Sequence, residues 1–203
     1  MESQQQLYRY INQLIPLSYT ELEPLSALVV TRHYKKKELL VKAGEVTTML
    51  YFICKGSLRE YFVQNRQQIT TDIILENTIS GGVSSFFTGQ PSLYNLEAME
   101  DVTALCISNS DLEKLYKSDV KWERFGRIIT GDFLIRQEQE ILNRLQFTPR
   151  EFFEYFFENY YELLQRAPQK YLASYLAIKP ETFSRLKKAY HKKMILLSKT
   201  KRT

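Results

Sequence analysis

The sequence of 203 residues is poor in the side chains that build metal centres, with two cysteines and two histidines. Cys54 and Cys106 each lie in a short apolar run, which predicts free thiols buried in strands. Two cysteines are too few for an iron–sulfur cluster held by thiolates alone. His33 and His191 are far apart in the sequence, so a His-rich metal site lacks its ligands. We therefore expect neither a metal nor a cofactor.

Long apolar runs are also missing. The longest span only a few residues, such as residues 194–197, so no segment is expected to cross a bilayer. Residues 1–6 have neither the basic nor the apolar region of a secretory signal, which predicts a cytoplasmic protein. The sequence has no Gly-rich phosphate loop and no nucleophile elbow, so an enzyme is not expected.

Charge is unevenly distributed along the chain. Residues 166–203 contain eleven Lys and Arg and one acid, Glu181, and therefore carry +10. Because the whole chain carries +5, residues 1–165 carry −5. An acidic body with a basic end predicts a polyanionic partner for that end. Charge alone leaves nucleic acid, an acidic membrane surface and a solvated tail open.

Short β-rich runs separated by turns occupy residues 38–108. Gly44 and Gly56 mark two of the turns, where glycine supplies a positive φ. The expected strands are residues 38–42, 50–54, 58–63, 68–75, 96–98 and 103–107. Six short strands at this spacing predict a small β-barrel, sandwich or roll.

Apolar residues at helical spacing precede and follow these strands. Residues 7–30 predict two short helices, broken at Pro16 and Pro24. Between Asp111 and Leu145 there is no proline, and an apolar edge indicates one long helix. The edge consists of Phe125, Ile128, Ile135, Leu142 and Leu145. We expect this helix to pair with its copy in a homodimer, and packing on its own domain is the alternative.

The chain from Thr148 onward predicts further helices. Thr148 and Pro149 are a start signal, with proline at the first helical position. The following residues are rich in Phe and Tyr at mixed helical spacing, which favours a packed core over a row of base-stacking rings. These residues are Phe152, Phe153, Tyr155, Phe156, Phe157, Tyr160 and Tyr161.

Residues 169–188 have the pattern of a helix, a tight turn and a second helix. Leu172, Ala173 and Leu176 are expected to face inward on the first helix, and Pro180 begins the second. The outward face of the second helix presents Glu181, Thr182, Ser184, Arg185 and Lys188. This pattern is typical of a helix-turn-helix whose basic face suits the major groove of DNA.

In its order of parts the chain resembles the bacterial cyclic-AMP receptor/fumarate–nitrate regulator (Crp/Fnr) family of transcription factors. The resemblance rests on residues 43–45 with 50–59, 84–92, 172–176 and 180–186. It implies an α+β fold in which residues 1–110 form a β-roll (double-stranded β-helix, jelly-roll-like), a cyclic-nucleotide-binding-like effector domain. Residues 111–147 are then a long connecting and dimerisation helix, and residues 148–203 an all-α DNA-binding domain with a reduced or missing wing.

The resemblance also implies roles for single residues. A Glu and an Arg of the family's recognition helix read base edges, which assigns cytosine to Glu181 and guanine to Arg185. The expected phosphate contacts are Gln169, Lys170, Lys187 and Lys188. Ala177 stands where the family has its turn glycine, which requires a negative φ at this position.

The stretch that matches the family's phosphate-binding cassette lacks the residues that bind cyclic AMP. Residues 67–113 contain seven acids and no Lys or Arg, whereas a buried phosphate needs a positive partner or the donors of a helix start. We expect weak or absent cyclic-AMP binding. An apolar or neutral small-molecule effector in this place and a filled core without ligand are the alternatives. The candidate pocket consists of Gly81, Gly82, Val83, Ser84, Ser85, Phe86, Phe87, Ser92 and Tyr94.

These patterns together predict a homodimeric transcription regulator that binds double-stranded DNA sequence-specifically and has a degenerate effector domain. No membrane partner is expected. The alternative is a ligand-sensing β-roll protein that acts through a protein partner rather than through DNA.

Overall fold

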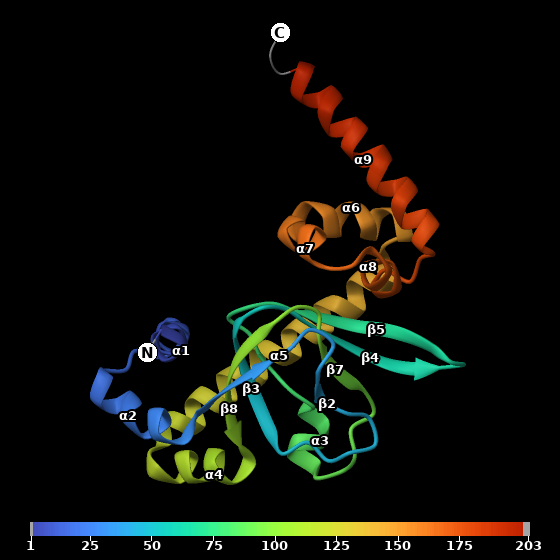
Figure 1. The fold of residues 1–203 in the computed structure, drawn as a ribbon. Coiled ribbons are helices and arrows are strands. Elements are labelled where there is room, and N and C mark those ends of the chain that lie inside the picture. The colour runs from blue at the N-terminus through green and yellow to red at the C-terminus, as the bar shows by residue number, and fades with distance from the viewer. Residues whose placement is uncertain (1, 201–203) are drawn as a thin grey trace. The chain divides into compact units, whose positions relative to one another are not determined.

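The strands form two antiparallel sheets of four strands each in the computed structural model, which describes residues 2–200 and the side chains up to residue 192 (Figure 1). The strands are β1 (Val30–Tyr34), β2 (Leu39–Val41), β3 (Met49–Lys55), β4 (Leu58–Gln64), β5 (Gln67–Ile74), β6 (Ile79–Ser80), β7 (Asn95–Ala98) and β8 (Val102–Ser108). Their order is β1-β8-β3-β6 in one sheet and β2-β7-β4-β5 in the other. All six predicted strands are confirmed, and β1 and β6 are additional.

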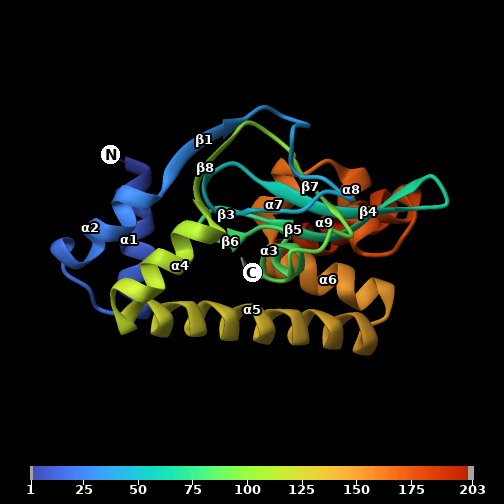
Figure 2. The same ribbon diagram turned by 90° about the horizontal axis from the view of Figure 1, so that it is seen from below.

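Helices precede, interrupt and follow the strands along the described chain. They are α1 (Glu2–Leu14), α2 (Tyr19–Leu28), α3 (Val83–Thr88), α4 (Asn109–Ser118), α5 (Val120–Gln146), α6 (Pro149–Asn159), α7 (Tyr161–Arg166), α8 (Gln169–Tyr175) and α9 (Pro180–Thr200). Helices α1, α2 and α4 gather at one end of the roll (Figures 1 and 2). The chain divides into two compact units after Ile135, within α5. The α+β fold with a β-roll, a long helix and a C-terminal helical domain is confirmed.

Two apolar clusters hold the N-terminal unit together. The first lies between the sheets and includes Tyr51, Ile53, Leu58 and Leu96. The second lies under α1, α2 and α4 and includes Trp122, near the start of α5. Burying these side chains is the main favourable term in folding. Among the described residues, no helix is long and apolar enough to cross a membrane.

Pro24 does not break the second helix, contrary to the prediction. It lies inside α2, which starts with a capping box in which Ser18 and Glu21 satisfy each other's backbone donors. A proline removes one backbone donor from a helix. Leu22 and Leu25 are buried on either side of Pro24, and this packing keeps the segment helical.

The long helix begins at Val120, later than Asp111, where the prediction placed it (Figure 2). Asp119 has an extended backbone, with φ −163° and ψ 138°, and separates α4 from α5. Its Oδ1 accepts a hydrogen bond from the backbone N–H of Lys121 at 2.9 Å, and its carbonyl accepts from Trp122. The break turns the chain so that the Trp122 side chain, 1% exposed, enters the second cluster.

Candidate functional site

The predicted helix-turn-helix consists of α8, a turn and α9. Leu172 and Ala173 of α8 and Phe183 of α9 are fully buried. The small side chain of Ala173 permits close packing of the two helices. The Phe183 ring meets that of Phe153, in α6, edge-on at a centroid distance of 5.3 Å. The motif is therefore anchored in the core of the C-terminal unit.

The phenylalanines of α6 form that core, as predicted, whereas Tyr155 is half-buried and Tyr160 and Tyr161 are exposed, contrary to the prediction. Phe152, Phe153, Phe156 and Phe157 are all buried. Thr148 caps the helix, because its side chain accepts from the backbone of Glu151 while the Glu151 carboxylate accepts from that of Thr148. The start signal in the sequence is thereby confirmed.

The turn between α8 and α9 has a left-handed residue that is not glycine. Ala177 has φ +54°, so the expected negative φ is wrong. The backbone N–H of Leu176 donates to Leu172, that of Ala177 to Ser174, and that of Ile178 to Ala173. These bonds close the end of α8 and require the left-handed conformation between them.

Ala177→Gly is therefore expected to stabilise the C-terminal unit. A left-handed L-residue costs about 1–2 kcal/mol, of which the greater freedom of glycine in the unfolded chain cancels a part, leaving a gain of about 0.5–1 kcal/mol. Thermal denaturation measures it. Ala189→Gly, at an exposed helical position of α9, should lower stability by about 1 kcal/mol instead. A lower melting temperature for Ala177→Gly would contradict the conclusion that the left-handed backbone of Ala177 is strained.

The residues predicted to contact DNA lie at the starts of α8 and α9. Gln169 and Lys170 are exposed in the first turn of α8. On α9, Glu181, Arg185 and Lys188 are exposed along one side, at spacings of four and three residues. Thr182, Ser184 and Lys187 are half-buried. The structure brings Glu181 and Arg185 onto one exposed, otherwise basic face.

The last turns of α5 are bonded to the helix-turn-helix. Arg144 donates from Nη1 to the carbonyl of Tyr175, the last residue of α8, at 3.0 Å, and from Nη2 to Oε1 of Glu140 at 2.9 Å. Its guanidinium also lies 4.7 Å from the centroid of the Tyr175 ring. A cation at the negative end of α8 is favourable. No pattern in the sequence indicates this contact, since residues 144 and 175 belong to different helices.

The candidate effector residues surround the short helix α3. The hydroxyl of Ser85 accepts a hydrogen bond from the backbone of Thr47 at 2.9 Å. A Cβ on Gly82 would lie 2.6 Å from Oγ1 of the same Thr47, so the loop and α3 pack closely. Phe86 is 3% exposed and Phe87 57% exposed. The remaining members are buried (Gly81, Ser92), half-buried (Val83, Tyr94) or exposed (Ser84).

Carboxylates lie close to the start of α3. Glu60 of β4 pairs with Asp72 of β5 across the strands, and Glu60 also pairs with Leu96, a member of the cluster between the sheets. The Tyr94 hydroxyl lies 3.4 Å from the carbonyl of Gly81. Burial, with Glu60 as a neighbouring negative charge, raises the pKa of Tyr94 above its ordinary value. The field beside α3 is therefore negative.

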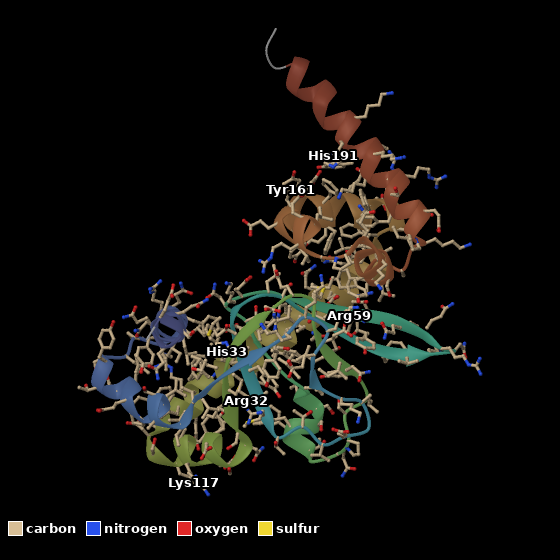
Figure 3. All side chains as sticks on the ribbon, viewed as in Figure 1. Arg32, His33, Arg59, Lys117, Tyr161 and His191 are labelled. Carbon is tan, nitrogen blue, oxygen red and sulfur yellow. The ribbon has the colours of Figure 1, made fainter. Side chains whose placement is uncertain are left out.

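A buried arginine occupies the opposite face of the same sheet. Arg59 is 2% exposed, and its Nε and Nη2 lie 3.2 and 3.3 Å from the carboxylate of Glu97 (Figure 3). It also donates to Oε1 of Gln68 at 2.6 Å and lies over the ring of Tyr61. Because side chains alternate along a strand, Arg59 points away from the interior that its neighbour Leu58 enters. Arg59 is among the residues that carry the family resemblance, but the sequence does not reveal that it pairs with Glu97.

The apolar edge predicted for dimerisation divides into two parts along α5. Phe125 and Ile128 pack against the second core cluster of the N-terminal unit. Ile135 and Leu142 are 65% and 40% exposed. The exposed part of α5 also includes Leu134, Ile141 and Leu145.

Residues 31–119 match the family model of the cyclic nucleotide-binding domain. A comparison with curated protein sequences finds no match. Among solved structures, the fold is similar to that of FixK2 from Bradyrhizobium japonicum, with a TM-score of 0.70 and 21% identity over 82% of this chain and 86% of that one.

Two further structures have the same fold. A CooA variant from Carboxydothermus hydrogenoformans has a TM-score of 0.64 and 17% identity, over 83% of this chain and 78% of that one. CLP from Xanthomonas campestris, a c-di-GMP-responsive global regulator, has a TM-score of 0.64 and 13% identity, over 87% and 93%. These structural neighbours are Crp/Fnr regulators, so the predicted resemblance is confirmed at the level of the fold.

Proposed function

We propose that this chain, which has the fold of the Crp/Fnr regulators, is a transcription regulator that binds double-stranded DNA sequence-specifically. The observation that carries the proposal is the exposed face of α9, where Glu181, Arg185 and Lys188 follow one another at helical spacing. This face lies in a segment of charge +10. A basic recognition helix presented by a rigid helix pair is the arrangement that enters the major groove.

We assign base reading to Glu181 and Arg185. A carboxylate accepts from the amino group of cytosine, and a guanidinium donates two parallel hydrogen bonds to guanine. Gln169, Lys170, Lys187 and Lys188 position the helix through phosphates, which carry no sequence information. A protein that binds bacterial DNA acts in the cytoplasm, so we propose that location. We propose no catalytic activity.

A homodimer is part of the proposal. Ile135 and Leu142 lie exposed, seven residues apart, on the same edge of α5, and pairing with a second α5 would remove them from water. Two recognition helices related by a twofold axis read inverted half-sites about one helical turn, or roughly 10 base pairs, apart.

We infer that the β-roll does not respond to cyclic AMP, because Glu60 and Asp72 would face its phosphate and Arg59 is committed to Glu97. Saturating cyclic AMP should leave both the melting temperature and the affinity for DNA unchanged. A ligand that binds the folded state must raise the melting temperature, so an increase would overturn this inference. The candidate pocket around α3 is compatible with a neutral or apolar effector.

The test of DNA reading is a salt titration of binding to the gene's own upstream DNA, with and without non-specific competitor. Arg185→Ala should lose about 1–3 kcal/mol of specific binding per half-site. Arg9→Ala removes an equally exposed arginine from α1 and serves as the charge-matched control. Binding that competitor removes, or that Arg185→Ala leaves unchanged, would contradict sequence reading and favour a protein partner instead.

A further inference from the structure

Helix α9 is much longer than the part of it that packs in the helix-turn-helix. It runs from Pro180 to Thr200, 21 residues, which at 1.5 Å per residue is about 31 Å. The last described residue of α9 that is buried in the unit is Tyr190, whose ring lies 4.4 Å from that of Phe157. Beyond it the helix continues past α6, α7 and α8 (Figure 1).

One side of α9 is a stripe of cations. Arg185, Lys188 and Lys192 follow one another at spacings of three and four residues, and all three are exposed. The other side carries Tyr190, and the ring of His191 meets Phe157 edge-on at 5.3 Å (Figure 3). After Glu181 the sequence contains no acid, so its charge is of one sign to the end.

A straight helix of this length cannot stay within the groove that it reads. The major groove is about 12 Å wide, and its walls are lined by phosphates. A recognition helix contacts bases with its N-terminal residues, so the rest of α9 leaves the groove over the backbone. The ten residues after Tyr190 extend about 15 Å further, or about four base pairs of duplex.

We propose that the second half of α9 binds the phosphates of the duplex that flanks the bases read by Glu181 and Arg185, with Lys192 as its first contact. The stripe begins at the base-reading residues and reaches Lys192 with no acid between Glu181 and Lys192, so the cation nearest the flanking phosphates has no opposing charge beside it in the sequence. The interface lies in the stretch after residue 190, which α9 continues as a helix to Thr200 and where the family pattern leads one to expect a wing. The proposal rests on the proposed DNA binding and adds a second, sequence-independent contact to it.

Lys192→Gln in the full chain tests the proposal on two duplexes. One is the shortest that retains Arg185-dependent binding, and the other adds six base pairs of arbitrary sequence at each end. Wild type should bind the longer duplex more tightly and with a steeper dependence on salt. Lys192→Gln should lose most of that gain, and its log–log salt slope on the longer duplex should fall by about 0.9 for each protomer bound. Lys192→Arg should restore both.

The controls separate this interface from base reading. Lys117→Gln removes an exposed cation from α4 and should bind both duplexes as wild type does (Figure 3). Arg185→Ala should lose specific binding to both. If Arg185→Ala has its effect and Lys192→Gln binds both duplexes as wild type does, the flanking interface is overturned and base reading stands. If Arg185→Ala also has no effect, the proposed function fails together with it.

Discussion

Glu97→Ala is expected to lower the free energy of unfolding of the β-roll by about 3–5 kcal/mol, because it removes the carboxylate that pairs with a buried charge. The affected charge is the guanidinium of Arg59, which is 2% exposed and bonded to both carboxylate oxygens of Glu97. The contact with Gln68 cannot neutralise it. At 2% exposure the guanidinium has little access to water that could replace the carboxylate.

Urea denaturation followed by the fluorescence of Trp122, the single tryptophan, measures this effect in the N-terminal unit. Lys35→Ala is the control: it removes an ion pair with Asp101 of which both members are exposed, and should change stability by less than about 1 kcal/mol. The double substitution Arg59→Met, Glu97→Leu should recover most of the loss, because an apolar pair replaces a buried ion pair at little cost. An unchanged midpoint for Glu97→Ala would refute the buried pairing.

Features that depend on neighbouring residues were predictable from the sequence. The turn at Gly56 is one: the residue has φ +91°, and a Cβ there would lie 2.6 Å from the carbonyl of Asp101, so only glycine fits. The start of α6 is another, since Thr148, Pro149 and Glu151 lie within four residues. Such signals need no knowledge of the rest of the fold.

Features that depend on distant pairing were not predictable. Strand β1 shows no apolar alternation, because four of its five residues are exposed and its place is set by pairing with β8, more than sixty residues away. The partners of Arg59 likewise lie on β5 and β7. The same holds in the C-terminal unit, where Arg144 of α5 contacts Tyr175 of α8, thirty-one residues further along the chain.

The break between α4 and α5 at Asp119 was missed because the sequence pattern favoured one continuous helix. No proline lies between Asp111 and Leu145, so nothing in the composition marks a break there. An aspartate accepts hydrogen bonds from the backbone two or three residues on, which favours the start of a helix over its interior. The packing of Trp122 decides between the two, and packing is not visible in a periodicity.

Phe183→Ala is expected to unfold the C-terminal unit selectively and to abolish DNA binding. Truncating a fully buried phenylalanine costs about 3–5 kcal/mol through lost burial and the cavity that remains. Phe183 joins α9 to Phe153 of α6, so its loss detaches α9, the proposed recognition helix, from the core that orients it. The roll, which has its own two apolar clusters, should keep its stability.

Two probes distinguish the units in a single urea titration. Far-ultraviolet circular dichroism reports on the helices of both units, whereas Trp122 reports on the N-terminal unit alone. For Phe183→Ala part of the helical signal should be lost at lower urea and the rest together with the fluorescence change, whose midpoint should stay near that of wild type. Tyr161→Ala removes a half-exposed ring from α7 and should shift neither midpoint by more than a small amount. Equal shifts of both midpoints would contradict selective unfolding, because they would show that the two units unfold in one cooperative transition.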